Sequence, residues 1–378
     1  MKFAKRVEQW VEAGIIDSAS AARIMAHEES RRGLTFVTAM LGIGGLAIFL
    51  GIAAIVGVNW DRIPGLVKIL VHALINSGIA FALYHVIRQS KTGVLVDLLA
   101  GVLAGLTFTF IALVGQIYQA QEPTWKALAL WLVLITPFLL SVARSQTLMR
   151  LWVIALLATY GFFVGDQIEK LDGLVRSLMI VMPPLVMIAV GQTTWLRSRF
   201  DVAMTQLSVI GHIVMVAHVS LAQIVWRTTD QWILYPLPDN NILWEAFIIS
   251  VVFALGIVGL RRAKLLIEMP QEIDILIVLS PIIGFLPMLG AHGDWPVIGA
   301  GIVMAYWGYC GWVGIKAGYR RALDVAVGFI ALRLVIVYVE VFGSLLQTGV
   351  GLIVSGFLLI GLVLGLRRIF AFMKKEIV

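Results

Sequence analysis

The chain has 378 residues, of which 60% are hydrophobic and only 13% are charged, and its mean hydropathy is +0.95. A soluble domain of this length could not cover its surface with so few charges, so the composition excludes that class. The formal charge of +7 does not indicate nucleic-acid binding, because the basic residues are spread over short connections and do not gather on one face.

Residues 1–32 predict a small cytoplasmic amphipathic helical hairpin. Trp10 belongs to one apolar helical face, Gly14 is a candidate helix stop, and Asp17 or Ser18 is a candidate N-cap for a second helix. The segment is too short for an independent catalytic domain. We expect it either to dock a partner or to pack on the protein's own cytoplasmic face.

Residues 33–367 predict a multi-pass transmembrane domain, because the apolar runs reach the roughly 20 residues that a helix needs to cross the hydrocarbon core. The expected fold is all-α, a polytopic integral membrane bundle of about 12 transmembrane helices. A basic cytoplasmic tail, 368–378, follows. The spans are expected at 35–58, 66–87, 94–117, 125–144, 148–165, 175–195, 202–225, 242–260, 273–290, 296–315, 324–343 and 348–366.

The distribution of the 29 Lys and Arg residues predicts the orientation. Most of them fall in connections on one side, including Arg197 with Arg199 and Arg261 with Arg262. The positive-inside rule places that side, and both termini, in the cytoplasm. The outer connections carry only Arg62, Lys68, Lys126, Lys170, Arg176 and Arg227.

Arg333 is the cation expected inside a span, where a charge costs roughly 2.5–3.5 kcal/mol without a partner or water. Glu340, Ser344 and Gln347 share a helical face with it. Two interpretations are open: a polar cleft that binds a substrate or ion, and a buried ion pair that holds helices in register.

Two further groups of polar residues are secondary candidates. His72 and Asn76 are four residues apart in the second span, and His212 shares a face with Thr205 and Ser208 in the seventh. A proton-relay or ligand role and ordinary interhelical packing are both consistent with these spacings.

Gln116 and Gln119, at the outer end of the third span, are candidates for binding a polar head group, or form an ordinary helix cap. Asp61 lies in the turn between the first and second spans and is either a helix cap or a binding residue. The lone Cys310 excludes an intramolecular disulfide and a cysteine-based metal cluster, so no metal and no cofactor are expected.

Prolines interrupt two of the expected spans, at Pro183-Pro184 and at Pro281 with Pro287. They predict broken helices, which often line binding sites, although proline is also common in ordinary membrane helices. Asp97 shares a face with Gly101 and is expected to pack or to accept hydrogen bonds.

Three stretches carry a family resemblance: 10–17 (WVEAGIID), 59–64 (NWDRIP) and 333–345. Together they resemble the bacterial predicted-membrane-protein family catalogued as domain of unknown function 2157, most clearly over residues 1–120. The resemblance implies a multi-pass protein of the bacterial cytoplasmic (inner) membrane. It also implies a second membrane-associated protein with a Gly-Asp-Tyr motif as a partner, and it transfers no catalytic residue.

Three classes of function remain. The first is a transporter or permease-like protein with a polar cleft near Arg333 and Glu340. The second is a non-catalytic subunit or scaffold of a membrane complex, and the third is a membrane enzyme acting on a lipid or lipid-linked glycan. The expected partners are the lipid bilayer and either a second membrane protein or another copy of the chain, with no nucleic acid.

Overall fold

The computed structural model describes residues 60–89, 93–142, 144–225, 240–290, 296–316 and 320–342. It also describes residues 10–25 and the positions 7, 40, 43–44, 47, 57–58 and 357. The chain forms two compact units, Met1–Leu74 and Ile75–Val378, and their boundary lies inside helix α3 (Gly65–Arg88).

The first unit begins with two short helical segments, residues 10–12 and 18–25. Gly14 has a φ of +68°, the left-handed conformation that ends a helix, and its amide donates to the Val11 carbonyl at 3.0 Å. Asp17 caps the second segment, since its Oδ1 accepts from the Ser20 amide at 3.2 Å, and hydrogen bonding from Ser20 lowers the pKa of Asp17. Packing of the segments as a hairpin stays a prediction.

Every regular element in the described residues is a helix, apart from an isolated bridge between Thr193 and Leu266. The elements that follow the N-terminal segments are η1 (Trp60–Arg62), α3, α4 (Val94–Ile117), α5 (Thr124–Val142), α6 (Gln146–Gln167), η2 (Ile168–Lys170), α7 (Gly173–Gln192), α8 (Thr194–Val225), α9 (Asn240–Arg262), α10 (Gln271–Gly290), α11 (Pro296–Lys316) and α12 (Arg320–Phe342).

Eight of the described helices, α3 to α9 and α11, are long and apolar enough to cross a membrane. Helices α10 and α12 have 20 and 23 residues, which also spans about 30 Å at 1.5 Å per residue. The spans predicted from 66–87 to 324–343 fall on helices α3–α12, of which eight are candidate membrane spans by length and composition. The first and last predicted spans, 35–58 and 348–366, lie outside the described residues except for a few isolated positions. The all-α multi-pass architecture is therefore confirmed, and the total of twelve stays a prediction.

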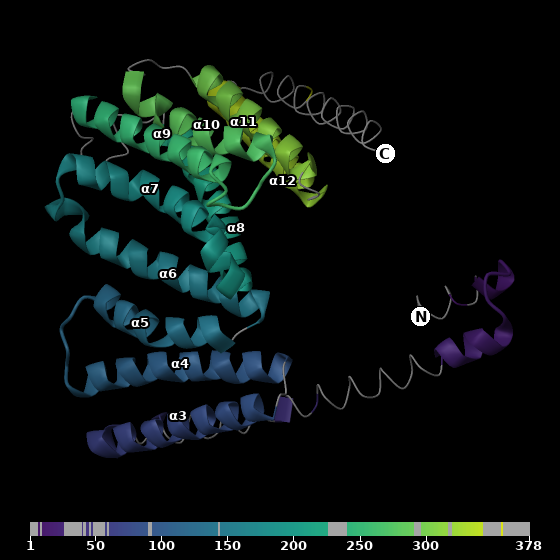
Figure 1. Ribbon diagram of the computed structural model, residues 1–378, viewed down its shortest axis with the longest axis vertical. Coiled ribbons are helices and arrows are strands. Elements are labelled where there is room, and N and C mark those ends of the chain that lie inside the picture. The colour runs from purple at the N-terminus through teal and green to yellow at the C-terminus, as the bar shows by residue number, and fades with distance from the viewer. Residues whose placement is uncertain are drawn as a thin grey trace. The chain divides into compact units, whose positions relative to one another are not determined.

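Helix α8 is the central packing element of the second unit. Helices α4 to α7 lie side by side, and α8 crosses their row (Figure 1). Its neighbours are α5, α6, α7, α10 and α11. One apolar core joins α8 to α3–α6 through Leu83, Ala100, Ile135, Val153 and Met204. A second core joins it to α7 and α9–α11 through Leu185, Met215, Ile257, Ile277 and Tyr306.

The interruption of helix geometry falls in α8 and not at the prolines. Phe200 has φ −134° and ψ 46°, which separates a short first segment from the long span. Helix α7 continues through Pro183 and Pro184, and α10 continues through Pro281. The expected breaks are therefore wrong, because flanking helical hydrogen bonds carry the chain past each missing N–H.

Two glycines let α7 and α8 approach closely. A Cβ added at Gly191 of α7 would lie 2.6 Å from the Ser208 amide nitrogen, and one at Gly211 of α8 would lie 3.0 Å from Met187 Cβ. Small residues of this kind are the usual means of close helix contact in membranes.

Helices α11 and α12 form a hairpin that packs on itself more extensively than on the rest of the unit. Trp307 and Phe329 stack with ring centroids 4.2 Å apart. A Cβ at Gly311 would lie only 2.9 Å from Ala326 Cβ, so the two helices are in close contact along their length. The hairpin is a discrete packing module, attached to α8 and α10 through α11.

We predict that Gly191→Ala destabilises the protein by about 1–3 kcal/mol, because the new methyl group meets α8 backbone that cannot move aside. The thermal unfolding midpoint in detergent micelles measures this. Gly256→Ala on α9 is the matched control, since nothing lies within 4 Å of its Cβ position. Equal midpoints for the two variants would contradict the close α7–α8 contact.

Candidate functional site

Arg333 lies in the middle of α12 and is buried, with 6% of its surface exposed. It interacts with neighbouring groups. Glu340 belongs to the same helix, but its side chain lies outside the described residues, as do Ser344 and Gln347. The structure therefore shows that Arg333 is buried in a helix, and its position inside the membrane and the cleft around it stay predictions.

His72 and Asn76 lie one turn apart on α3, both half-buried and both in contact with other groups. Asp61 is exposed within η1, where Trp60 packs against Lys68 with its Nζ 4.2 Å from the ring centroid. No binding role follows from either arrangement, and both stay predictions.

Gln116 and Gln119 are exposed at the end of α4. Gln119 has a φ of 48°, and the next amide, Ala120, donates to the Gly115 carbonyl at 2.9 Å. This is a helix C-cap, the second of the two interpretations of that sequence. Asp97 accepts hydrogen bonds from the Arg144 and Ser145 amides at 2.8 and 3.2 Å, as its expected hydrogen-bonding role requires.

His212 projects from the same face of α8 as Thr205 and Ser208, as predicted. Its Nδ1 lies 2.7 Å from the Ser208 carbonyl, so that nitrogen carries the proton and donates it. Nε2 is buried and has no hydrogen-bond partner among the described residues. His212 thus presents a lone pair to the interior, next to a polar cluster that the sequence did not reveal.

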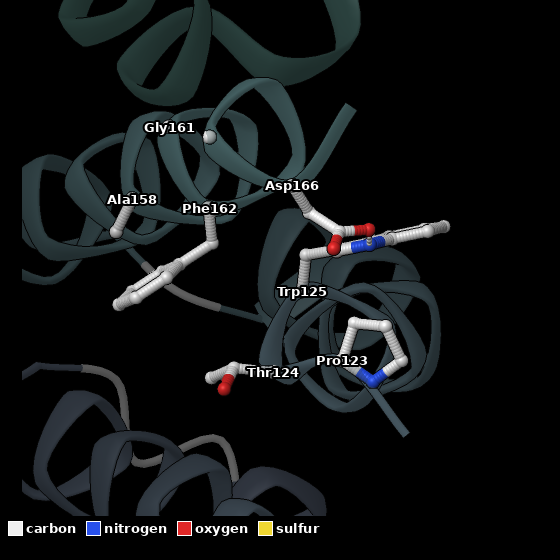
Figure 2. Close-up of a pocket in the computed structure, with 8 residues that line it drawn as sticks. Pro123, Thr124, Trp125, Ala158, Gly161, Phe162 and Asp166 are labelled. Carbon is white, nitrogen blue, oxygen red and sulfur yellow. Dashed lines mark hydrogen bonds between the residues drawn. The ribbon is translucent and has the colours of Figure 1, made fainter. Parts of the chain in front are cut away.

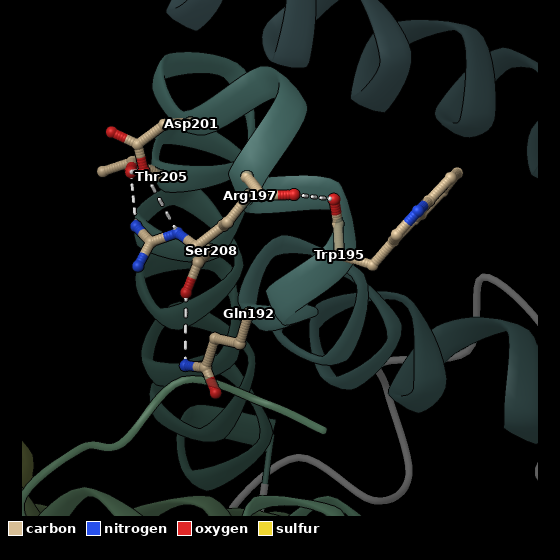
Figure 3. A network of polar contacts seen from close by, with 7 residues as sticks. Gln192, Trp195, Arg197, Asp201, Thr205 and Ser208 are labelled. Carbon is tan, nitrogen blue, oxygen red and sulfur yellow. Dashed lines mark hydrogen bonds and ion pairs between the residues drawn. The ribbon is translucent and has the colours of Figure 1, made fainter. Parts of the chain in front are cut away.

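That cluster, which we call the clasp, consists of Gln192, Ser208, Arg261 and Asp274. Arg261 forms an ion pair with Asp274 and donates to Gln192 Oε1. Gln192 donates onwards to Ser208 Oγ at 3.3 Å (Figure 3). The four residues come from the end of α7, the middle of α8, the end of α9 and the start of α10.

Backbone contacts reinforce the clasp where two connections meet. The Thr194 amide donates to the Leu265 carbonyl at 3.1 Å, and the Ile267 amide donates to the Gln192 carbonyl at 2.9 Å. The α7–α8 and α9–α10 hairpins are therefore tied together at one end of the bundle, which we call the clasp end.

Burial distinguishes the clasp from an ordinary surface ion pair. The Arg261 and Asp274 side chains are 4% and 9% exposed, whereas those of Lys316 and Glu272, paired at 2.5 Å, are 48% and 19% exposed. Arg261 was expected in the connection after the eighth span, and the structure places it in the last turn of α9, where it is buried. The sequence did contain one signal of a buried ion pair: Asp274 is a carboxylate between Ile273 and Ile275 in an apolar run.

Other cations at the clasp end also turn inward. Arg197 donates to Thr205 Oγ1 and lies 3.6 Å from an oxygen of Asp201, across the interruption in α8 (Figure 3). Arg150 of α6 donates to Gln206 of α8 at 2.7 Å. Arginines expected in loops thus contribute interhelical contacts as well as charge.

A second set of polar contacts, which we call the seam, joins α11 to α8 and α10. Trp307 donates to Ser220 at 3.0 Å, and the hydroxyls of Tyr306 and Ser280 are 2.9 Å apart. Tyr309 donates to the Glu272 carbonyl at 3.0 Å. Cys310 is half-buried and packs against both the core of α7–α11 and the core of the hairpin.

We predict that Asp274→Asn or Arg261→Gln lowers the free energy of unfolding by about 3–5 kcal/mol, because each leaves an uncompensated buried group. The double variant Arg261→Met/Asp274→Leu should lose much less. Denaturation in micelles measures all three. Glu272→Gln is the control and should cost at most about 1 kcal/mol. Additive losses in the double variant would contradict the pairing.

Comparison with known proteins gives one match. Residues 8–149 match the model of a family described as Predicted membrane protein (DUF2157). No curated protein and no solved structure matches the chain. The predicted resemblance is confirmed over that segment, and the eight long apolar helices agree with the family's description as a membrane protein.

Proposed function

We propose that the protein is a transporter or permease-like protein of the bacterial cytoplasmic membrane, with both termini in the cytoplasm. The proposed solute path follows the seam between α11–α12 and the clasped helices α7–α10. One observation carries the proposal: the buried Arg333 lies on a hairpin that packs chiefly on itself and meets the bundle through polar side chains.

The strengths of the contacts support relative movement of the two modules. Interhelical hydrogen bonds in membranes contribute on average about 0.6 kcal/mol each, so the three seam bonds together contribute roughly 2 kcal/mol. The Lys316–Glu272 pair is partly exposed and adds at most about 1 kcal/mol. Breaking the buried clasp costs more than this sum. By its polar contacts the seam is the weaker of the two attachments, and we propose that it is the interface that opens.

The positions of these contacts also favour a particular motion. Lys316, Tyr309 and Glu272 hold α11 near the clasp end, where α10 begins. The opposite end of α11 lacks a comparable ion pair among the described residues. Rocking of the hairpin about the clasp end would expose the seam to water from the other side, which is the alternating-access motion of many transporters.

A scaffold is the second candidate, and the closed state of the seam favours it. The described seam hydroxyls and the indole N–H of Trp307 all have partners, as in a permanent helix interface. The two candidates differ in one observable property, the access of water to the seam.

Cys310, the single cysteine of the chain, reports that access. We predict that a membrane-impermeant thiol reagent labels Cys310 in native membranes, because rocking would bring water to a thiol that is packed in the closed state. Mass spectrometry of the intact protein measures the labelled fraction over time.

Two variants in a Cys310→Ser background calibrate the rates. Leu332 lies on α12 and is 55% exposed. A cysteine at this position should face lipid and should therefore not react. Arg262→Cys lies at the exposed last residue of α9, at the clasp end, and should react fastest. Labelling of Cys310 as slow as that of Leu332→Cys would reject the transporter and leave the scaffold.

A further inference from the structure

The surface of α5 and α6 at the end opposite the clasp contains a pocket of about 540 Å³, which we call the groove. Its floor is the stripe Ala158, Gly161 and Gly165 on α6, all exposed. Cβ positions at the two glycines would have no atom within 4 Å. Phe162 forms one wall, and the groove lies on the surface of α6, which is a candidate membrane span.

The carboxylate of Asp166 lies at one end of the apolar groove. Asp166 and Trp125 lie together at one end of the groove, and Ala158 and Phe162 lie at the other (Figure 2). Asp166 Oδ2 accepts from Trp125 Nε1 at 3.1 Å and from Gln167 Nε2 at 2.5 Å. Trp125 is held in turn by an edge-to-face contact with Phe163, whose ring centroid is 5.1 Å away.

Asp166 forms no close ion pair within the described part of the chain, although Lys126 and Lys170 both act on it electrostatically. Both of its hydrogen-bond donors are uncharged, and both bind the same oxygen. Lys126 pairs with Glu122 at 2.6 Å, and Lys170 is near enough to act electrostatically on Asp166 but forms no ion pair with it. A cationic group placed on Oδ1 would supply the missing charge, and at the edge of the hydrocarbon such a pair is stronger than in water.

The dimensions of the groove match one kind of occupant. Asp166 lies in the last turn of α6, and Trp125 lies in the first turn of α5, the level at which tryptophan marks a membrane boundary. Ala158 is eight residues before Asp166, about 12 Å deeper along the helix. The ligand is therefore cationic at the headgroup level and apolar over the next ~12 Å.

We propose that the groove binds a phospholipid whose headgroup carries an ammonium group, as in phosphatidylethanolamine. The ammonium group lies against Asp166, and an acyl chain lies along Ala158, Gly161 and Gly165. This site is separate from the seam and does not depend on the proposed transport function.

Native mass spectrometry of the full chain, delipidated and then incubated with phosphatidylethanolamine or phosphatidylglycerol, tests the assignment. Wild type should retain the ethanolamine lipid at least fivefold more than the glycerol lipid. Asp166→Asn should abolish that preference, whereas Glu169→Gln, which removes an exposed carboxylate in η2 at the same end but outside the groove, should keep it. Free ethanolamine at equal concentration should not displace the lipid.

A second variant tests the acyl-chain contact. Gly161→Leu fills the floor and should reduce retention of both lipids, while Gly256→Leu, on an open face of α9, should not. Equal retention of the two lipids by wild type would overturn the proposal. So would a dimer of wild type that Gly161→Leu dissociates, because the stripe would then be a helix-packing surface between two copies.

Discussion

The charge of Arg261 is the constraint on which the arrangement of the second unit depends. A guanidinium buried where a helix ends must find both a counter-charge and hydrogen-bond acceptors. Asp274 supplies the first and Gln192 supplies an acceptor, and each comes from a different helix. Meeting that requirement brings the ends of α7 and α9 to the start of α10, and the glycine contacts of Gly191 then bring α8 into the same cluster.

A bundle tied at one end has an uneven distribution of stability. The clasp end combines a buried ion pair with backbone bonds between the two connections, whereas the seam relies on single hydrogen bonds that are weak in membranes. The α11–α12 hairpin, with its own stacked aromatic pair and close glycine contact, remains intact if those bonds break. Arg333 lies on the module with the weaker attachment, which is why the proposed function centres on it.

The length of the apolar runs was sufficient to predict the helices. The predicted span 94–117 has the bounds of α4, and 296–315 differs from α11 by one residue, because each of these helices is bounded by polar or turn-forming residues that end an apolar run. Proline was a misleading signal, since a helix within a bundle continues past it. Phe200 carried no signal of the interruption in α8.

The polar sites were less predictable than the helices, because they depend on which helices meet. His212 was placed correctly on the face of Ser208 by spacing within one helix. Arg261, Asp274 and Gln192 were missed because they are far apart in the chain and look like ordinary helix-end residues. Asp166 and Trp125 were missed for the same reason, since 41 residues separate them.

The most direct test of this account is a distance measurement across the seam by pulsed electron paramagnetic resonance in lipid nanodiscs. Spin labels replace Leu221 on α8 and Ile298 on α11, both exposed at the end opposite the clasp, in a Cys310→Ser background. A reference pair replaces Arg262 and Trp312 at the clasp end. The account predicts two distances for the first pair and one for the reference pair. A single narrow distance for both pairs would contradict a hairpin that moves about a fixed clasp.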